Sequence, residues 1–135
     1  MPHAPLPHTA DTGIEATAPT FASLVEELAT GMFELMAETD CATGRASELE
    51  ISSVSNEDLV VDTLSELLYL SETEDLHFCR FTVTGGDNHS VRVRAMGVPM
   101  RDVEFSGPPI KAVTYHQLEV AESAHHCYGR VYFDV

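Results

Sequence analysis

The sequence predicts an α+β fold, a single domain in which two helices pack on one face of a mostly antiparallel or mixed β-sheet. The chain has 135 residues, a length typical of one domain with one hydrophobic core. Apolar residues recur at helical spacing in two segments of the first half, whereas they alternate with polar residues along the second half. Helices placed early among runs of strands are typical of α+β domains.

The first elements are a short strand and a long helix. A strand is expected over residues 11–17, because Pro19 ends the alternation. The run TFASLVEELATGMFELMAE (20–38) has apolar residues every three or four positions, which predicts a helix, and Thr20 can cap its first turn. Gly31 lies inside this helix, where glycine costs about 1 kcal/mol relative to alanine. We therefore expect another stretch of backbone to pass close to Gly31.

A second strand and a second helix follow a loop over residues 39–47. The run ELEISSV (48–54) alternates in the manner of a strand with one wet face. Ser55 and Asp58 resemble a capping box, so a helix is predicted from this point to about Ser71.

Beyond this helix the pattern is that of strands. Residues 77–84 and 89–97 are predicted to form a hairpin around the turn GGDN. A final pair is predicted from IKAVTYHQLEV (110–120) and CYGRVYFDV (127–135), joined through AESAHH. The residues expected on the buried face of the first hairpin are Cys79, Phe81, Val83, Val91, Val93 and Ala95.

Charge restricts the function. The formal net charge is −15 at pH 7, and 16 of the 22 acidic residues fall in residues 1–79. Such a surface repels phosphate backbones, so no stable direct binding of nucleic acid is expected, whereas a basic protein partner or a cation suits it. The acidic excess is equally consistent with a role in solubility alone.

Composition also bears on the compartment. No segment approaches the roughly 20 apolar residues of a membrane span, and the opening MPHAPLPHTAD lacks the basic start and apolar run of a secretory signal. We therefore expect a cytoplasmic protein without a membrane contact, with a flexible N-terminal arm over residues 1–7 and the folded domain over residues 8–135. Cys41, Cys79 and Cys127 are odd in number and widely spaced, so three reduced thiols are expected.

Three short segments contain residues that can carry chemistry. They are HTAD with His8 and Asp11, KAVTYH with Lys111 and His116, and the ending FDV with Asp134 and the terminal carboxylate of Val135. Taken alone, HTAD is typical of a solvated loop, KAVTYH of a surface lysine beside a packed histidine, and FDV of an edge strand with a charge. The neighbouring carboxylates of Asp134 and Val135 also suit calcium, magnesium or manganese. Two oxygen donors are too few for such an ion, so Asp11 or Asp40 and water would have to supply the other ligands. No nucleophile motif or phosphate-binding loop is present, so the chain is not expected to be an enzyme.

Five segments, taken in order, resemble the archease family: HTADTGIEA, LVEELATGMFELM, VDTLSELLYL, KAVTYH and YFDV. The resemblance runs from His8 to Val135 and implies an archease-like fold. It implies a non-catalytic activator of the tRNA-splicing RNA ligase, one that promotes guanylylation of the ligase by GTP and multiple turnover in tRNA splicing and RNA repair. Residues 63–65 depart from the family, since many relatives carry tryptophan and asparagine in this part of the second helix.

The resemblance also implies the site residues. A divalent ion, with calcium as the first expectation and magnesium or manganese as alternatives, is implied at Asp11, Asp134 and Val135, with Asp40 as a further ligand. Residues implied in ligase activation or partner contact are Lys111, His116 and His8. On this interpretation the strand pattern continues to Val135 because the strand holds the terminal carboxylate in place as a ligand of the metal ion. The side-chain oxygens of Asp11 and Asp134 are then expected within about 5 Å of each other.

Two other functions remain open. One is a chaperone-like interaction module whose divalent metal is structural, which predicts many partners and a lower melting temperature after chelation. The other is a metal-dependent phosphoesterase, against which stands the missing nucleophile.

Overall fold

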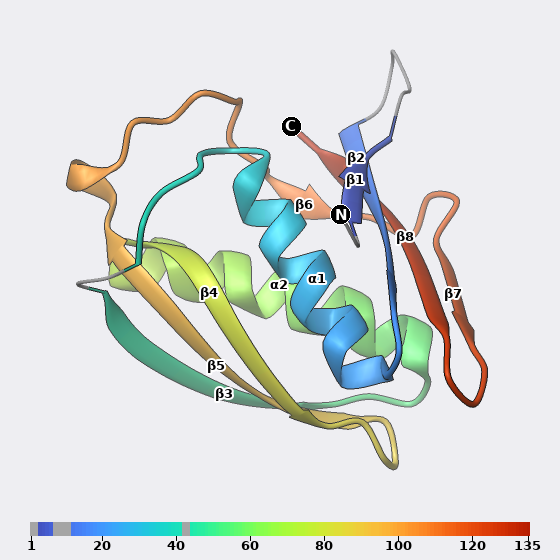
Figure 1. Cartoon of the computed structure of the whole chain (residues 1–135). Helices are drawn as coiled ribbons and strands as arrows, with labels where there is room; N and C mark the ends of the chain where they lie inside the picture. The colour runs from blue at the N-terminus through green and yellow to red at the C-terminus, as the bar shows by residue number, and fades with distance from the viewer. Residues whose placement is uncertain (1–2, 7–11, 42–43) are drawn as a thin grey trace.

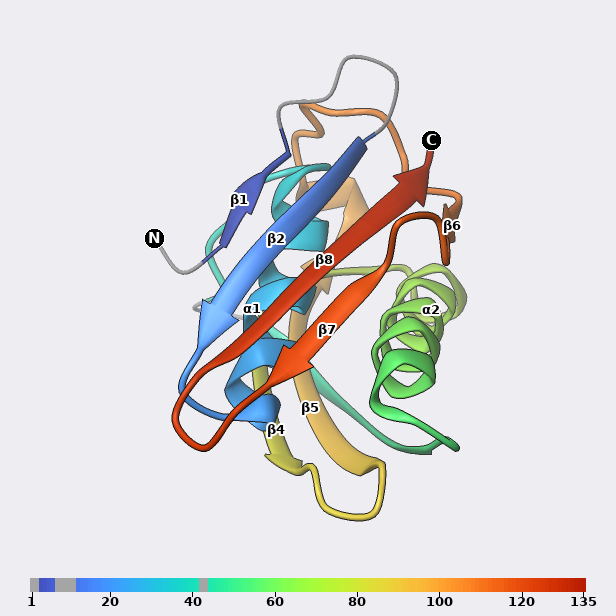
Figure 2. The same ribbon diagram turned by 90° about the vertical axis from the view of Figure 1, so that its right-hand side faces the viewer.

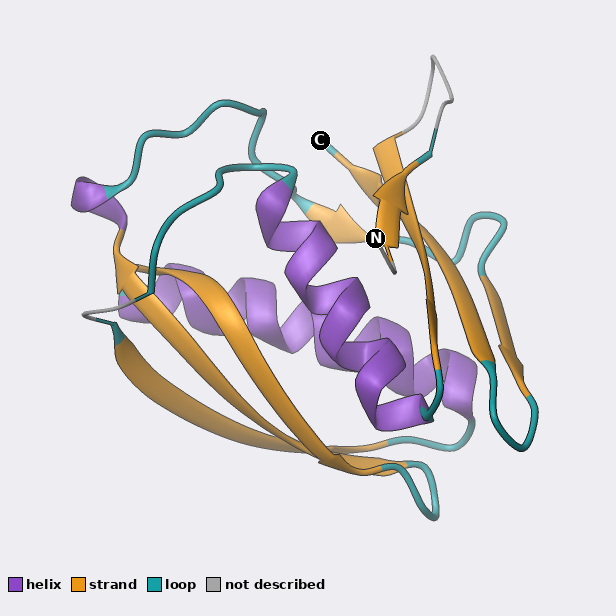
Figure 3. Cartoon of the chain, viewed as in Figure 1, coloured by secondary structure: helices purple, strands orange, loops and turns teal. Residues whose placement is uncertain are grey.

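The computed structural model describes residues 3–6, 12–41 and 44–135. Within these ranges the chain forms two α-helices, eight β-strands and one 3₁₀ turn (Figures 1 and 3). The helices are α1 (Phe21–Glu34) and α2 (Asn56–Glu74), and the 3₁₀ turn covers Met100–Asp102. The strands are β1 (His3–Pro5), β2 (Thr12–Ala18), β3 (Arg45–Ser52), β4 (Leu76–Gly85), β5 (Ser90–Pro99), β6 (Ala112–Val113), β7 (Glu119–Glu122) and β8 (Cys127–Asp134). The predicted α+β class is confirmed.

The described strands form two sheets instead of the single sheet expected. One sheet has the order β1-β2-β8-β6, with β7 also paired to β8, and the other has the order β3-β5-β4. The strands of each pair run antiparallel. Helix α1 accounts for the presence of two sheets. Its buried residues occupy more than one stripe of the helix surface, so the helix must pack against other elements on two sides. Figures 1 and 2 show α1 between the sheets, with α2 beside them.

Both helices begin at the caps that the sequence predicted. The hydroxyl of Thr20 accepts the N–H of Ser23 at 3.1 Å, and the hydroxyl of Ser23 accepts the N–H of Thr20 at 3.1 Å. The hydroxyl of Ser55 accepts the N–H of Asp58 at 3.1 Å, but the Asp58 carboxylate bonds to Tyr115 instead of closing the capping box. Such a cap stabilises a helix by about 1 kcal/mol. Neither helix in the described ranges is both long and apolar enough to cross a membrane.

The central hairpin is confirmed. Phe81 lies opposite Ala95 and Val83 lies opposite Val93 in the β4–β5 ladder, and all four are buried. The solvent face of the same ladder carries exposed arginines, as the alternation predicted.

Another part of the chain does pass close to Gly31, but it is a side chain rather than backbone. A Cβ on Gly31 would lie 3.0 Å from Cδ2 of His3 and 3.3 Å from Cδ1 of Ile14. His3 belongs to β1, which pairs with β2. Residues 3–5 therefore form part of a sheet, although we expected a flexible arm over residues 1–7. The boundary predicted at residue 8 lies outside the described residues.

The strand predicted over residues 110–120 is interrupted. Within this range the structure has two short strands, β6 and, after a gap, β7, each of which pairs with β8. Between them the N–H of Leu118 bonds to the carbonyl of Tyr115 at 3.2 Å, and Gln117 has a φ of 48°. A left-handed residue turns the chain out of the extended conformation, which the alternation of residue types did not reveal.

Two of the cysteines contradict the expectation of reduced thiols. Cys41, in the loop after α1, and Cys79, on β4, are joined by a disulfide whose Cα atoms are 5.8 Å apart, a normal separation. The β4–β5 register shifts between Phe78 and Arg80, and such a bulge changes the direction of the side chain within it. Cys127 is free and buried. The prediction was wrong because two cysteines 38 residues apart carry no local signal of their proximity.

Candidate functional site

The end of β8 is tied into the sheet. The backbone carbonyl of Asp134 accepts the N–H of Lys111 at 2.8 Å, and Asp134 lies opposite Ala112 of β6. These contacts hold a chain end that would otherwise fray. Asp134 is exposed and Val135 is 48% exposed, so a ligand in solution can reach both.

The KAVTYH segment is fixed to β8 by Thr114. The N–H and the hydroxyl of Thr114 both donate to the carbonyl of Tyr132, each at 3.0 Å. The ring centroid of His116 lies 5.6 Å from that of Tyr132. Tyr132 and Asp134 are two residues apart on β8 and so share one face of the sheet. The structure thus brings Lys111, through its backbone, and His116, through its ring, to the final residues of β8.

Strand β2 lies on the other side of β8, and its first residue, Thr12, is paired with Phe133. Asp11 and His8 lie outside the described residues, so the expected approach of Asp11 to Asp134 stays a prediction. The covalent chain is compatible with it, because consecutive Cα atoms are about 3.8 Å apart and Asp11 directly precedes Thr12.

Asp40 is exposed in the loop that follows α1, next to the disulfide. In Figures 1 and 2 the C-terminal end of α1 and the C-terminus of the chain lie at the same end of the molecule. Within residues 3–6, 12–41 and 44–135, no three His, Cys, Asp or Glu side chains are grouped to hold a metal ion. Asp40 and Asp134 are therefore not a complete site, and a metal there needs further donors.

A contact that the sequence did not suggest joins the KAVTYH segment to α2. The hydroxyl of Tyr115 donates to Oδ1 of Asp58 at 2.6 Å. This hydrogen bond raises the pKa of Tyr115 to about 12, because the neutral phenol is the donor and a phenolate would face a carboxylate. The two residues are 57 positions apart, so no local pattern links them.

The contact gives a testable prediction. Replacing Asp58 by asparagine is expected to lower the pKa of Tyr115 from about 12 toward its ordinary value of 10.0, because the negative acceptor is removed. The measurement is a pH titration of the tyrosine Cζ resonance by ¹³C NMR. Asp62→Asn is the matched control, since Asp62 is the weaker of the two neighbouring acids, and its effect should be much smaller. Equal effects of the two variants would contradict the assigned contact.

The model of the Archease protein family matches residues 4–135 of the chain. The chain belongs to the archease family. The archease of Methanosarcina barkeri is 34% identical to it over 137 residues, which cover 96% of this chain and 93% of that protein. The archease of Methanothermobacter thermautotrophicus is 30% identical over 131 residues, which cover 94% of each chain. The family resemblance inferred from the sequence is confirmed.

Solved structures share the fold of this archease. The solution structure of Methanobacterium thermoautotrophicum protein 1598 matches with a TM-score of 0.73 at 24% identity, over 99% of each chain. The crystal structure of a Thermotoga maritima archease, described as a possible chaperone, matches with a TM-score of 0.65 at 23% identity, over 98% of this chain and 96% of that one.

A small hollow of about 230 Å³ lies beside Lys111 of this archease, between α2 and β6. Tyr69, which is 64% exposed, lines it, as does Ser65, one of the residues that depart from the family pattern. Of the three residues that depart, Thr63 and Leu64 are buried, so only Ser65 changes an accessible surface next to the candidate residues.

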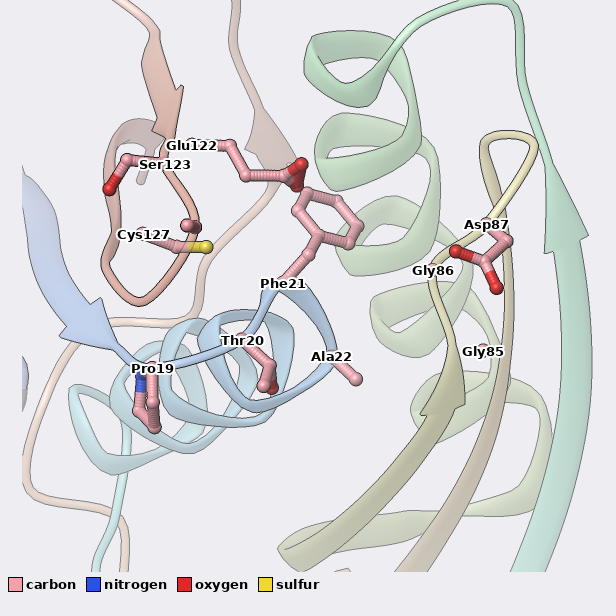
Figure 4. A pocket seen from close by; sticks show the side chains of 11 residues that line it. Pro19, Thr20, Phe21, Ala22, Gly85, Gly86, Asp87, Glu122, Ser123 and Cys127 are labelled. Atoms are coloured by element: carbon pink, nitrogen blue, oxygen red, sulfur yellow. The ribbon is translucent and has the colours of Figure 1, made fainter.

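A larger hollow of about 550 Å³ lies at the start of α1, between the turn after β4 and the turn before β8 (Figure 4). Asp87 and Glu122 give it acidic walls, and Cys127 lines it at the first residue of β8. Asp134 ends the same strand, and seven residues of strand span about 23 Å. The hollow is therefore separate from the candidate site, and no residue that the sequence singled out for chemistry lines it in the described ranges.

Proposed function

We propose that this archease is a non-catalytic activator of the tRNA-splicing RNA ligase, one that promotes metal-dependent guanylylation of the ligase by GTP. It thereby supports multiple turnover in tRNA splicing and RNA repair. The observation that carries the proposal is the gathering of Asp134, Val135, Lys111 and His116 at the accessible end of β8. Carboxylates there can bind a cation, while an amine and an imidazole can contact phosphate oxygens.

The proposed cofactor is a divalent ion, calcium, magnesium or manganese, held by Asp134 and the terminal carboxylate of Val135 with Asp11 and Asp40. These donors fit a hard cation because all of them are carboxylate oxygens. The Asp134 side chain is exposed and receives no hydrogen bond from the described residues, so it is available to a ligand. When bound, the ion would supply positive charge beside the reacting phosphates. The chain's own part is to fix the carboxylates at the end of a rigid strand.

Charge supports the choice of partner. A net charge of −15 suits docking at the basic cleft of a ligase that grips RNA, and it opposes stable binding of RNA by the archease itself. Two of the bases are moreover paired with acids, Arg92 with Glu50 at 2.6 Å and Arg130 with Glu119 at 3.4 Å. We propose that the two proteins meet in the cytoplasm and that added salt slows their association.

A second candidate function is a chaperone-like interaction module with a structural divalent metal. The description of the Thermotoga maritima archease as a possible chaperone favours it. The two functions differ in the effect of a chelator. A structural metal stabilises the fold, so chelation lowers the melting temperature, whereas an ion at the exposed end of β8 leaves it nearly unchanged. A phosphoesterase is disfavoured if no phosphate ester is hydrolysed with calcium, magnesium or manganese.

The proposal is tested by guanylylation of the ligase from the same organism. Transfer of labelled GMP from GTP to the ligase is expected to be at least about tenfold faster with the archease and a divalent ion, a barrier reduction of about 1.4 kcal/mol. Heat-denatured archease serves as the control. An equal rate with and without the folded, metal-supplied protein would overturn the proposal.

A further inference from the structure

His3 lies between two carboxylates of α1. Its Nδ1 is 2.7 Å from Oε1 of Glu27 and its Nε2 is 2.8 Å from Oε1 of Glu34. His3 is only 9% exposed, and the two glutamate side chains are 30% and 39% exposed. A buried ring thus joins the N-terminal strand to the central helix through both of its nitrogens.

The chemistry of the three groups fixes the charge of the ring. A neutral imidazole has one N–H donor and one bare acceptor nitrogen, whereas an ionised carboxylate only accepts. Two ionised carboxylates can therefore both be hydrogen-bonded to one ring only when both nitrogens carry a proton. His3 in this arrangement is an imidazolium that makes two charge-assisted hydrogen bonds.

Gly31 provides the seat for the ring. Glu27, Gly31 and Glu34 are spaced four and three residues apart, so they lie on one face of α1. A Cβ at Gly31 would be 3.0 Å from the ring of His3, closer than carbon atoms normally pack. A glycine inside a helix costs about 1 kcal/mol, and here it admits the ring. The space for the ring is therefore part of the helix itself and does not depend on the charges of Glu27 and Glu34.

The surroundings of His3 favour its charged form. Burial lowers the pKa of His3, but the hydrogen bonds and charges of its two glutamates more than offset this and raise the pKa above 6.5. The hollow around the ring is about 370 Å³, and its described lining includes a further acid, Glu38, but no lysine or arginine. The acid of β2, Glu15, accepts the hydroxyl of Tyr128 instead of facing the ring.

We propose that His3 is a proton-operated latch for β1: its imidazolium, seated on Gly31 between Glu27 and Glu34, holds the strand against α1, and loss of one proton releases the strand. Strand β1 has only three residues and lies at the edge of its sheet, so few ladder bonds hold it and the contacts of His3 are a large part of its docking. Since the pKa of His3 is raised on docking, its stabilisation is complete below pH 6.5 and is lost as the pH rises through the raised value. Release uncovers Ile14 and leaves β2 as the free edge of its sheet.

The latch is tested on the full chain by two NMR titrations. The Cε1–H signal of His3 is expected to titrate above pH 6.5. The amide of Leu6, which donates to the carbonyl of Gly13 at 3.0 Å just beyond β1, reports docking through hydrogen exchange. Its protection is expected to start falling near pH 6.5 and to level off above the raised pKa of His3, by about tenfold in total for each unit by which docking raises the pKa, after correction for the intrinsic pH dependence of exchange.

Variants separate the latch from simple packing. In the double variant Glu27→Gln with Glu34→Gln the pKa of His3 is expected to fall below 6.5, because burial then acts without the two charges. Docking then no longer favours the charged ring, so the loss of Leu6 protection with rising pH should disappear. Glu38→Gln is the matched control, because it removes one charge from the same hollow without removing a contact to the ring. The proposal is overturned if His3 titrates at or below 6.5 in the native protein, or if the protection of Leu6 does not follow its titration.

Discussion

Replacing Asp134 by alanine is expected to abolish the stimulation of ligase guanylylation without changing the fold. The Asp134 side chain is exposed and receives no hydrogen bond from the described residues, whereas its backbone contacts to Lys111 and Ala112 remain in the variant. Loss of a direct ligand should lower the affinity for the ion by at least about a hundredfold, because loss of a group that only supports a ligand already lowers metal affinity by up to about a hundredfold. The measurement is the rate of GMP transfer to the ligase at a fixed metal concentration.

Glu122→Gln is the matched control for this variant. It removes one negative charge from an exposed position that pairs with Cys127, at the opposite end of β8. Its stimulation should be close to that of the native protein, except for a small effect of net charge on association. Asp11→Ala is expected to behave like Asp134→Ala. An unchanged guanylylation rate in either of these two variants would refute the shared metal site.

The parts of the fold that the sequence predicted are those with local causes. Thr20 and Ser55 cap the two helices because a hydroxyl needs only the N–H three residues on. The β4–β5 hairpin follows from alternation on both sides of a short turn, and it sets Val83 opposite Val93 as expected. In each case the residues that decide the structure lie within one turn or one hairpin of each other.

The parts that the sequence did not predict depend on residues brought together by the whole fold. The division into two sheets, the Cys41–Cys79 bridge, the Tyr115–Asp58 hydrogen bond and the His3 ring against α1 all join distant segments. No local period encodes which distant segments meet, so these contacts need coordinates. Gly31 was the one local sign of such a contact, and it indicated a close approach without identifying His3.

The candidate site was predictable in the same uneven way. The family resemblance singled out Lys111, His116 and Asp134 as functional, but nothing in their spacing shows that the first two meet the end of β8. The structure adds this through the backbone bond from Lys111 to Asp134 and the ring contact of His116 with Tyr132. The meeting of Asp11 with Asp134 is still a prediction, because Asp11 lies outside the described residues.

Reduction of the Cys41–Cys79 disulfide is expected to lower the free energy of unfolding by roughly 2–4 kcal/mol. The bridge closes a loop of 38 residues and so restricts the unfolded chain, and it also ties the loop that carries Asp40 to β4. For a domain of this size such a loss corresponds to a melting temperature about 10 °C lower. Thermal unfolding followed by circular dichroism, with and without dithiothreitol, measures the difference. In a reducing compartment the protein would therefore be present in its reduced form, which is the less stable of the two.

Two variants show whether the bridge itself causes the shift. The double variant Cys41→Ser with Cys79→Ser should melt near the reduced native protein and should not respond to dithiothreitol. Cys127→Ser should keep the response, because Cys127 is free and lies outside the bridge. Alkylation of the unreduced, denatured chain counts thiols directly, and the bridge requires one modified cysteine before reduction and three after it. Three modified cysteines before reduction would show that the thiols stay unpaired, and the stability difference would then have no basis.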